Sequence, residues 1–390
     1  MLSRLSISKV MKRRDAFIDW TEKEEIKFYN KLIAKSKTKL DSIKERKLNF
    51  PQALYPVENV PLEWWYFTGH LEDKTKKKKL GFEYCIFKFN PLALRFGIFP
   101  LSFLRKKPFL TFHCAITDKN NKSFTIFQDS GMVHHQDINY GELNLGIESS
   151  NLKLNLNKKT NSFSIGSKSN DINLDLKLTP LKKMVKHYGN GYTVMYSHPE
   201  HRTYYLTFSR LKTIGKVKLK GKDYSVSGLS WFDHQKLNLP HGSSLRGWDW
   251  FSIMLNDKTE LMFFVLRNKQ GLVHKFMGGT YIDKNSKTIN LSPQDVEIEV
   301  ISNWISPNTN ISYPSGWKLN IPKLKLNLNI TPDVEDQEIK RMFTTPINYW
   351  EGACSVIGSK NGKKIKGQSY VELVGYDQRL STKILQSFYR

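Results

Sequence analysis

Apolar and polar residues alternate in short segments from about residue 60 to the end of the chain. Segments such as "KLGFEYCIFKF", "FLTFHCAITD", "YYLTFSRL" and "ELMFFVLRN" are separated by glycine, asparagine, aspartate and lysine turns. A period of two is typical of a strand with one buried face, and many short strands with turn signals between them are typical of a β-sandwich or β-barrel. The pattern predicts an all-β fold in which helices are scarce after residue 60.

The first 50 residues follow a different pattern. Thr21 and Glu24 match a capping box, and apolar residues that include Ile26 and Ile33 recur at roughly helical spacing. A lysine-rich amphipathic helix is therefore predicted from about residue 21 to 47. We expect this helix to pack against the body of the protein; the alternative is a helix that lies on a membrane surface or binds a partner.

The chain also contains two internal similarities. A shift of 184 positions lays "EWWYFTGHLED" on "GWDWFSIMLND", with Tyr66 on Trp250. A shift of 139 positions lays "GLSWFDH" on "GQSYVEL", with Asp233 on Glu372. Because the similarities occur in the same order, they indicate two related β domains, each of which opens with an aromatic strand and closes with an aromatic-x-acid strand.

Chain length agrees with this division, since 390 residues exceed what one hydrophobic core usually supports. The predicted organisation has three parts. Residues 1–50 form a basic helical N-terminal extension, residues 51–240 form the first β-barrel, and residues 241–385 form the second.

The formal net charge of +25 invites a nucleic-acid interpretation, which the distribution of the charge does not favour. Lysines alternate with leucine at strand spacing, as in "PKLKLNLNI", and this alternation marks solvent-exposed faces. We therefore predict no nucleic-acid partner. Attraction to anionic lipid headgroups is a secondary expectation, which would give peripheral membrane contact through the basic surface.

The expected compartment is the cytoplasm. No run of about 18 apolar residues is present to span a bilayer, and the N-terminus lacks an apolar segment of secretory length. Cys85, Cys114 and Cys354 lie inside apolar segments without Cys-x-x-Cys spacing, so they read as small core residues in a reducing environment.

Acids in the closing strands lie beside aromatic rings. Residues two apart on a strand share a face, so Trp231 accompanies Asp233, and Tyr370 accompanies Glu372. Rings around a carboxyl group disfavour its charged form, which raises its pKa and lets it hold a proton near neutral pH. Aromatic faces also stabilise a developing cation. An acid among rings suits protonation of an apolar alkene.

The opening strands add further rings and acids. Trp64 and Tyr66 share one face, Glu63 groups with Trp65, and Asp249 lies among tryptophan and phenylalanine residues. The non-catalytic interpretation is that these acids are hydrogen-bonded plugs of a barrel mouth, with indole N–H groups donating to carboxylates.

Other chemistry has little support in the sequence. His134 and His135 are adjacent and would point to opposite faces of a strand, which is poor geometry for zinc. The chain has no serine-nucleophile elbow, P-loop or dinucleotide fingerprint. Neither a metal site nor a nucleotide cofactor is therefore predicted.

Four separated segments together resemble a known family: "LEWWYFTGHL", "VSGLSWFDHQ", "RGWDWFSIML", and "YWEGACSVIG" followed by "GQSYVELVGY". They are similar to the signature segments of the AttH/carotenoid 1,2-hydratase-like family. The resemblance covers about residues 50–380 and implies two lipocalin-like β-barrel domains in tandem. It also implies a cofactor-independent enzyme or binder whose partner is a hydrophobic small molecule, often a polyene.

The resemblance further implies a role for Asp233, since the acid of the aromatic-x-Asp motif is the expected proton donor in the hydratases. Trp231 stands where the hydratases tend to have tyrosine, and an indole cannot relay a proton as a phenol can. We expect acid-initiated hydration or isomerisation of a C=C bond in an isoprenoid, polyene or lipid-like substrate, in a pocket in or beside the first barrel. The alternative is a non-catalytic carrier of a lipid or pigment.

The candidate residues fall into two groups. The catalytic candidates are Asp233, Trp231, His234 and Glu63. The substrate-binding candidates are Trp64, Trp65, Tyr66, Trp248, Asp249, Trp250, Tyr349, Glu351, Tyr370 and Glu372.

Overall fold

The computed structural model describes most of the chain from residue 45 onward. The described ranges are 45–58, 60–90, 95–96, 99–100, 108–132, 138–147, 151–194, 202–237, 245–268, 278–340 and 347–377. The His134–His135 pair lies outside these ranges, and so does the expected N-terminal helix apart from residues 45–47, which are not helical. Across the described ranges, no helix has the length and apolar character needed to cross a bilayer.

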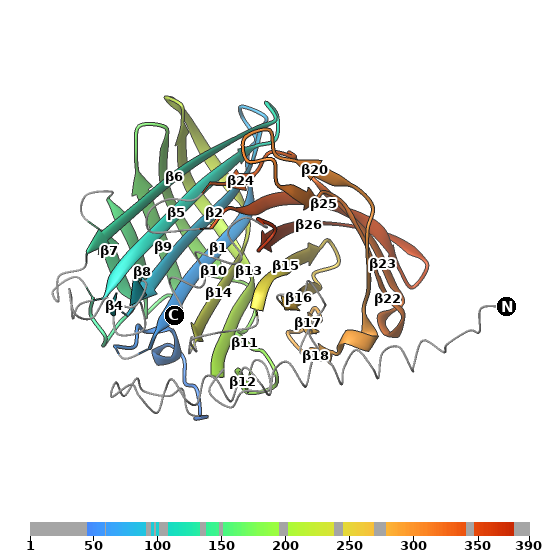
Figure 1. Ribbon diagram of the computed structural model, residues 1–390, viewed down its shortest axis with the longest axis horizontal. Coiled ribbons are helices and arrows are strands. Elements are labelled where there is room, and N and C mark those ends of the chain that lie inside the picture. Colours follow the sequence, from blue (N-terminus) through green and yellow to red (C-terminus); the bar gives the residue numbers. More distant parts are fainter. Residues whose placement is uncertain are drawn as a thin grey trace.

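The first half of the chain forms one curled antiparallel sheet (Figure 1). Its strand order is β6-β5-β2-β1-β14-β13-β10-β9-β8-β7, and β11 and β12 also pair with β13. The strands are β1 (Leu62–Asp73), β2 (Lys78–Phe89), β5 (Phe109–Asp118), β6 (Ser123–Met132), β7 (Asn144–Ile147), β8 (Leu152–Asn157), β9 (Ser162–Lys168), β10 (Ile172–Pro180), β11 (Val185–Lys186), β12 (Tyr192–Val194), β13 (Arg202–Leu219) and β14 (Lys222–Leu237). The short 3₁₀ helix η1 (Gln52–Leu54) precedes them, and β3 (Arg95–Phe96) pairs with β4 (Phe99–Pro100).

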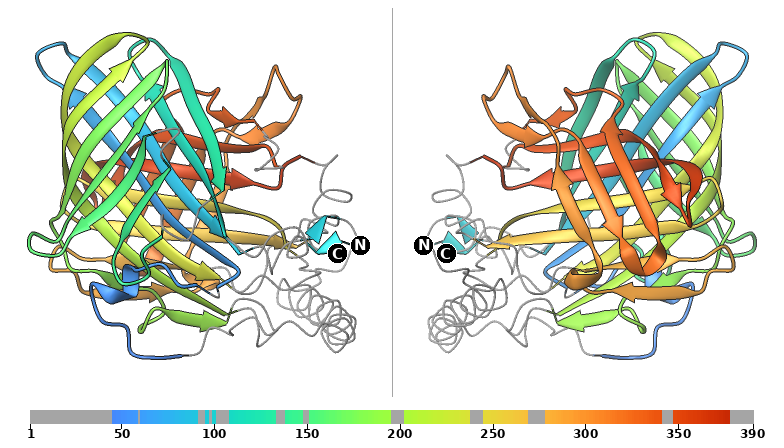
Figure 2. Two further views of the ribbon diagram at one scale, coloured as in Figure 1. Left: turned by 90° about the vertical axis from the view of Figure 1, so that its left-hand side faces the viewer. Right: turned by 90° about the vertical axis from the view of Figure 1, so that its right-hand side faces the viewer.

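The second half forms another curled antiparallel sheet, beside the first (Figure 2). Its order is β18-β17-β16-β15-β26-β25-β23-β22-β19, with β24 paired to β25 and a separate β20-β21 pair. The elements are β15 (Leu245–Leu255), β16 (Glu260–Asn268), β17 (Gly278–Ile282), β18 (Thr288–Leu291), η5 (Pro293–Asp295), β19 (Glu297–Val300), β20 (Asn303–Ile305), β21 (Ser312–Pro314), β22 (Trp317–Ile321), η6 (Pro322–Leu324), β23 (Leu326–Pro332), β24 (Glu338–Ile339), β25 (Tyr349–Lys360) and β26 (Lys363–Val374).

Each sheet curls around its own apolar core. In β8, "LKLNLN", buried leucines alternate with exposed lysine and asparagine, as a strand with one wet face requires. Phe67, Phe163 and Phe232 meet in the first core, where the ring centroids of Phe67 and Phe232 are 4.5 Å apart. Trp317 and Trp350 pack in the second core. The prediction of an all-β fold with two lipocalin-like domains in tandem is confirmed.

Strand register reproduces the internal similarity of the sequence. In the first sheet, β1 pairs with β14 so that Tyr66 lies opposite Asp233. In the second sheet, β15 pairs with β26 so that Trp250 lies opposite Glu372. These are the residues that the two sequence shifts superpose, so the two sheets share their central pairing as well as their strand order.

The two barrels meet face to face through an aromatic layer, which we call the interdomain layer. It contains Tyr66, Tyr205 and Trp231 from the first barrel, against Trp250 and Tyr370 from the second, with methionine, phenylalanine and small residues between them. The backbones also approach closely, because a Cβ added at Gly81 of β2 would lie 2.5 Å from the Cβ of Ala353 on β25. Only a residue without a side chain fits at position 81.

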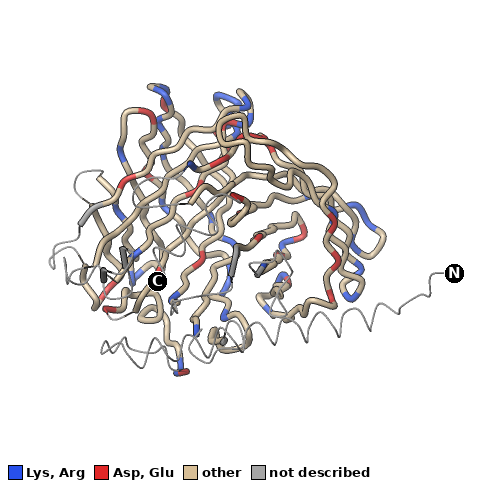
Figure 3. Tube along the Cα trace, viewed as in Figure 1, with Lys and Arg blue, Asp and Glu red and all other residues tan. Residues whose placement is uncertain are grey.

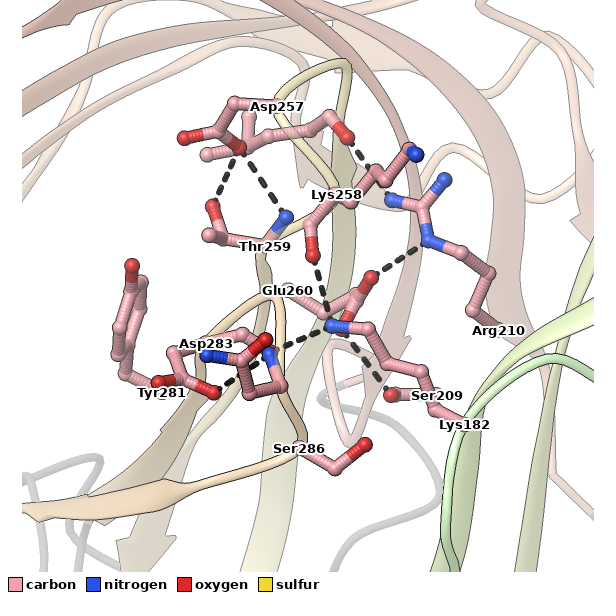
Figure 4. A network of polar contacts seen from close by, with 12 residues as sticks. Lys182, Ser209, Arg210, Asp257, Lys258, Thr259, Glu260, Tyr281, Asp283 and Ser286 are labelled. Carbon is pink, nitrogen blue, oxygen red and sulfur yellow. Dashed lines mark hydrogen bonds and ion pairs between the residues drawn. The ribbon is translucent and has the colours of Figure 1, made fainter.

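An ion cluster also holds the barrels together (Figure 4). Glu260 of β16 is fully buried, and its two oxygens accept from Lys182 Nζ at 2.5 Å and from Arg210 Nε at 2.6 Å. Lys182 also donates to the backbone oxygens of Lys258 and Asp283. Both cations come from the first barrel, whereas their acceptors belong to the second, so the cluster fixes the relative position of the domains.

Basic residues are dispersed over the surface. Figure 3 shows lysine and arginine at hairpins on several separate edges of the molecule. Peripheral membrane contact through this surface stays a prediction.

Candidate active site

Asp233 lies in the interdomain layer on the outward face of β14. Its side chain is buried, at 3% exposure. The Tyr205 hydroxyl donates to Oδ2 at 2.6 Å, and the Trp231 indole donates to Oδ1 at 2.8 Å. The Thr207 hydroxyl also donates to Oδ1. Two of these donors come from β13, because the β13–β14 register places Thr207 opposite Asp233.

Burial governs the acidity of this carboxyl group. It raises the pKa of Asp233 from 3.8 to about 7, although the hydrogen bonds from Thr207, Tyr205 and Trp231 act in the opposite direction. Both protonation states are therefore populated near neutral pH, which is the range in which a general acid works best.

A chain of hydrogen bonds connects Asp233 to the second barrel. The Trp250 indole donates to the Tyr205 hydroxyl at 2.8 Å. His187 lies 2.7 Å from the Thr207 hydroxyl through Nε2 and 2.8 Å from the Thr280 hydroxyl through Nδ1. Burial lowers the pKa of His187 to about 3, so the ring is neutral. Since the Thr207 hydrogen points to Asp233, Nε2 carries the imidazole proton.

Glu372 occupies the equivalent position in the second barrel. Burial raises the pKa of this partly buried carboxyl to about 7, the charge of Asp233 raises it further, and a hydrogen bond from Trp248 lowers it. Asp233 and Glu372 therefore sense each other across the interdomain layer. Because two negative charges there repel, ionisation of one acid disfavours ionisation of the other.

Two further glutamates lie in the same layer. Glu351 of β25 accepts a 2.6 Å hydrogen bond from the Tyr66 hydroxyl. Glu83 of β2 is 1% exposed, and neither of its oxygens has a hydrogen-bond partner. Burial raises the pKa of both carboxyl groups, and the charge of Glu372 raises both further.

Aromatic rings enclose these acids. The ring of Tyr66 meets the edge of Trp250 at 5.3 Å, and Trp231 lies 6.3 Å from Trp250. Tyr349 is also buried here, with its hydroxyl 2.6 Å from His113 Nδ1. The rings of Trp64, Phe87 and Trp248 pack at the edge of the layer and are only partly buried.

Three of the candidate residues lie on the other face of the first sheet. Glu63, Trp65 and His234 point into the first barrel, where the Trp65 ring stacks on His234 at 4.9 Å. Glu63 pairs with Lys88 at 3.3 Å and Lys236 at 3.6 Å. The catalytic candidates Glu63 and His234 therefore do not face the Asp233 carboxyl, because neighbours on a strand point to opposite faces.

Asp249 is likewise separated from the interdomain layer. It forms an ion pair with Arg267 and accepts hydrogen bonds of 3.0 Å from the Tyr376 hydroxyl. Tyr376 packs against the core of the second barrel, so Asp249 belongs to that barrel's interior side. Its contacts are those of a structural ion pair. The expectation that Asp249 contacts substrate together with Trp248 and Trp250 is not supported.

Ten candidates do share the interdomain layer or its edge. They are Trp64, Tyr66, Trp231, Asp233, Trp248, Trp250, Tyr349, Glu351, Tyr370 and Glu372. Asp233 thus lies between the two barrels, on the outer face of the first barrel.

Sequence reasoning missed Tyr205, Thr207, His187 and Glu83. Glu83 carried a signal, since "FEYCIF" places a charged residue inside an otherwise apolar strand. Tyr205 and Thr207 alternate in "TYYLTFSR", but nothing local indicates that this strand pairs with the one that carries Asp233.

The side chains of the site do not converge as ligands of a metal ion do. Among the residues that the structure describes, no group of three or more histidine, cysteine, aspartate or glutamate side chains could hold a metal. The described site is thus an arrangement of acids, hydroxyl groups and aromatic rings.

Fold and site together define a protein of two tandem lipocalin-like barrels with a buried acid between them. The chain belongs to the AttH-like family, whose model matches residues 42–376. No curated protein matches the sequence significantly.

Solved structures share this architecture. An AttH protein from Nitrosomonas europaea is 24% identical with a TM-score of 0.75, over 86% of this chain and 99% of that chain. Kievitone hydratase from Nectria haematococca is 16% identical with a TM-score of 0.66, over 87% of this chain and 96% of that chain. CghA in complex with Sch210972 is 10% identical with a TM-score of 0.57, over 87% and 95%. At these identities the likeness shows the fold.

Proposed function

We propose that this protein is a cofactor-independent enzyme that hydrates or isomerises a C=C bond of a hydrophobic isoprenoid or polyene substrate. The observation that carries the proposal is the Asp233 carboxyl, which is buried among aromatic rings with its pKa raised to about 7. A carboxyl group of this kind is protonated in a large share of the molecules at neutral pH and lies where an apolar alkene would be shielded from water.

Tyr205 answers the objection that Trp231 cannot relay a proton. The phenol that the motif lacks at position 231 is supplied by the neighbouring strand, 2.6 Å from Asp233 Oδ2. Tyr205 also accepts from Trp250, so its hydroxyl connects the acid with the second barrel. In the proposed reaction, Asp233 donates its proton to one alkene carbon, directly or through Tyr205.

The electrons of the double bond form the new C–H bond, and the second carbon becomes cationic. The faces of Tyr66, Trp231 and Trp250 stabilise this charge by about 0.5 to 2 kcal/mol per well-placed ring. In a hydration, the oxygen of water forms a bond to the cation and a water proton passes to the Glu372 carboxylate. In an isomerisation, the cation instead loses a proton from the neighbouring carbon. Either route returns one proton to the acid pair per turnover.

The comparisons support the class of reaction through the fold, because a protein named as a hydratase has the same two-barrel architecture. The test is deuterium incorporation. Wild-type protein is incubated in D₂O with isoprenoid alkenes that include lycopene, and with kievitone, and the recovered compounds are analysed by mass spectrometry. Asp233→Asn should abolish incorporation while substrate still quenches tryptophan fluorescence. Glu299→Gln, on a side chain that is 65% exposed, is the matched control and should retain activity.

A non-catalytic carrier is the second candidate, and the three hydrogen bonds on Asp233 favour it, since a fully bonded carboxyl can simply close the interdomain layer. A carrier would bind the alkene stoichiometrically without incorporating deuterium, and Asp233→Asn would leave its ligand bound. Deuterium in the product of the wild type, lost in Asp233→Asn, excludes the carrier.

A further inference from the structure

Glu83 and Glu351 form a buried acidic pair that the proposed reaction does not use. Each is 1% exposed, and they lie on β2 of the first barrel and β25 of the second. Glu372, partly buried, stands opposite Glu351 in the β25–β26 register. In the described part of the chain, no lysine or arginine forms an ion pair with any of the three.

Glu83 is the member that points to a missing partner. Both of its carboxyl oxygens are buried and accept no hydrogen bond. Buried polar groups are almost always hydrogen-bonded, because an unsatisfied one loses its hydration without any replacement.

Electrostatics indicate the charge of that partner. Burial raises the pKa of Glu83, Glu351 and the Tyr349 hydroxyl. The charge of Glu372 raises the pKa of both glutamates further, and the charges of Glu83 and Glu351 raise that of Tyr349 further. The imidazoles of His113 and His70 give no compensation, because burial lowers the pKa of His113 to about 3 and also lowers the pKa of His70, whose ring packs on Tyr370. Burial and mutual repulsion of the charged forms thus favour the protonated acids, and a positive charge placed here would stabilise the carboxylate form instead.

The geometry favours an organic cation over a metal ion. No described cluster has the convergence of ligands that a metal requires. The surroundings are instead rings: Tyr66 donates to Glu351, Trp250 meets the Tyr66 ring at 5.3 Å, and Phe87 lies 5.5 Å from the His113 ring. Aromatic faces beside carboxylates are the surroundings in which proteins bind alkylammonium groups.

We propose that the Glu83–Glu351 pair is a binding site for a protonated amine carried on an apolar molecule. The amine enters with its proton, the O–H bond of a glutamic acid breaks and releases that proton to a water molecule, and an ammonium–carboxylate pair results. The ammonium group then donates to the Glu83 oxygens. This inference goes beyond the proposed reaction, because it concerns acids other than Asp233 and requires no turnover.

The positive net charge of the protein means that general electrostatics would not favour an amine over a neutral molecule. At +25 the molecule repels cations on average, so a preference for an amine over a neutral analogue cannot come from general attraction. Tighter binding of the amine therefore requires a local acidic site that attracts cations despite the positive net charge.

The test compares benzylamine with benzyl alcohol, which have similar size and differ in charge at pH 7. Dissociation constants are measured by calorimetry on the full chain. The amine should bind at least about tenfold more tightly than the alcohol, as expected for a hydrogen bond between charged groups. Glu83→Gln should reduce that ratio to about one, whereas Glu299→Gln, at an exposed carboxyl, should leave it unchanged.

Equal affinities for the two probes in the wild type would overturn the proposal, and so would an unchanged ratio in both Glu83→Gln and Glu351→Gln. Glu351→Gln serves if Glu83→Gln does not fold, as judged by its circular dichroism. Asp233→Asn separates this site from the reaction. If Asp233→Asn still binds the amine but no longer incorporates deuterium, both proposals stand. If the wild type incorporates deuterium but does not prefer the amine, the amine site has failed. If the wild type prefers the amine but incorporates no deuterium, the proposed reaction has failed.

Discussion

Replacing Asp233 with asparagine should change how the stability of the protein depends on pH. The native state raises the pKa of this carboxyl from 3.8 to about 7, so the folded protein holds a proton that the unfolded chain releases. The associated stability is fully present below about pH 3.8 and is lost as pH rises to about 7.

The magnitude follows from the size of the shift. A rise from 3.8 to about 7 corresponds to about 4 kcal/mol, at about 1.4 kcal/mol per pKa unit. Asparagine is nearly isosteric but does not titrate. Its oxygen can accept from Thr207 and Trp231, and its amide can donate to the Tyr205 oxygen. The wild type should therefore lose about 4 kcal/mol more than Asp233→Asn between pH 4 and pH 8.

Urea unfolding at a series of pH values, followed by tryptophan fluorescence, measures this difference. Glu372 is present in both proteins, and only the part of its pKa shift that comes from the Asp233 charge differs, so the comparison isolates Asp233 together with its coupling to Glu372. Glu299→Gln removes a carboxyl group at an exposed position, so its free energy of unfolding should depend on pH as that of the wild type does. If Asp233→Asn also ran parallel to the wild type, the carboxyl would not be held in a dry layer, and the catalytic argument would fail with it.

Two further predictions concern the contact between the barrels. Glu260→Gln should lower the free energy of unfolding by about 3 to 5 kcal/mol, because it leaves Lys182 and Arg210 buried without their anion. Thermal and urea unfolding would measure this loss, and an unchanged unfolding midpoint would contradict the role of the cluster. Gly81→Ala should cost about 1 to 3 kcal/mol through its clash with Ala353, and Gly81→Ala combined with Ala353→Gly should restore stability. If the double variant were no more stable than Gly81→Ala, the clash would not be with Ala353 and the prediction would be wrong.

Much of the fold could be predicted because its signals are local. The period of two in segments such as "LKLNLN" reports which residues face the core, and the structure confirms it for β8. The two sequence shifts also predicted that Asp233 and Glu372 are equivalent, and the cross-strand pairs Tyr66–Asp233 and Trp250–Glu372 confirm the relation. Strand order was not predictable, since β13 and β14 close the sheet against β1 over a long distance along the chain.

The site was only half predictable for the same reason. Alternation correctly grouped Glu63 with Trp65 and separated them from Tyr66, but it does not say which face of the sheet meets a second domain. Adjacency drew His234 into the catalytic group, although adjacent residues on a strand point apart. The donors to Asp233 were out of reach, because Tyr205 becomes its neighbour only through strand pairing.

The two related sheets carry acids at equivalent positions but in different surroundings. Asp233 is buried and accepts three hydrogen bonds, whereas Glu372 is partly buried and receives one from Trp248. Their pKa values are both raised to about 7, and the charge on Asp233 raises that of Glu372. Since the first ionisation opposes the second, the pair holds about one proton near neutral pH. One acid can then donate while the other accepts, which is the division of roles that adding water to an alkene requires. The more exposed Glu372 is the one that water can reach.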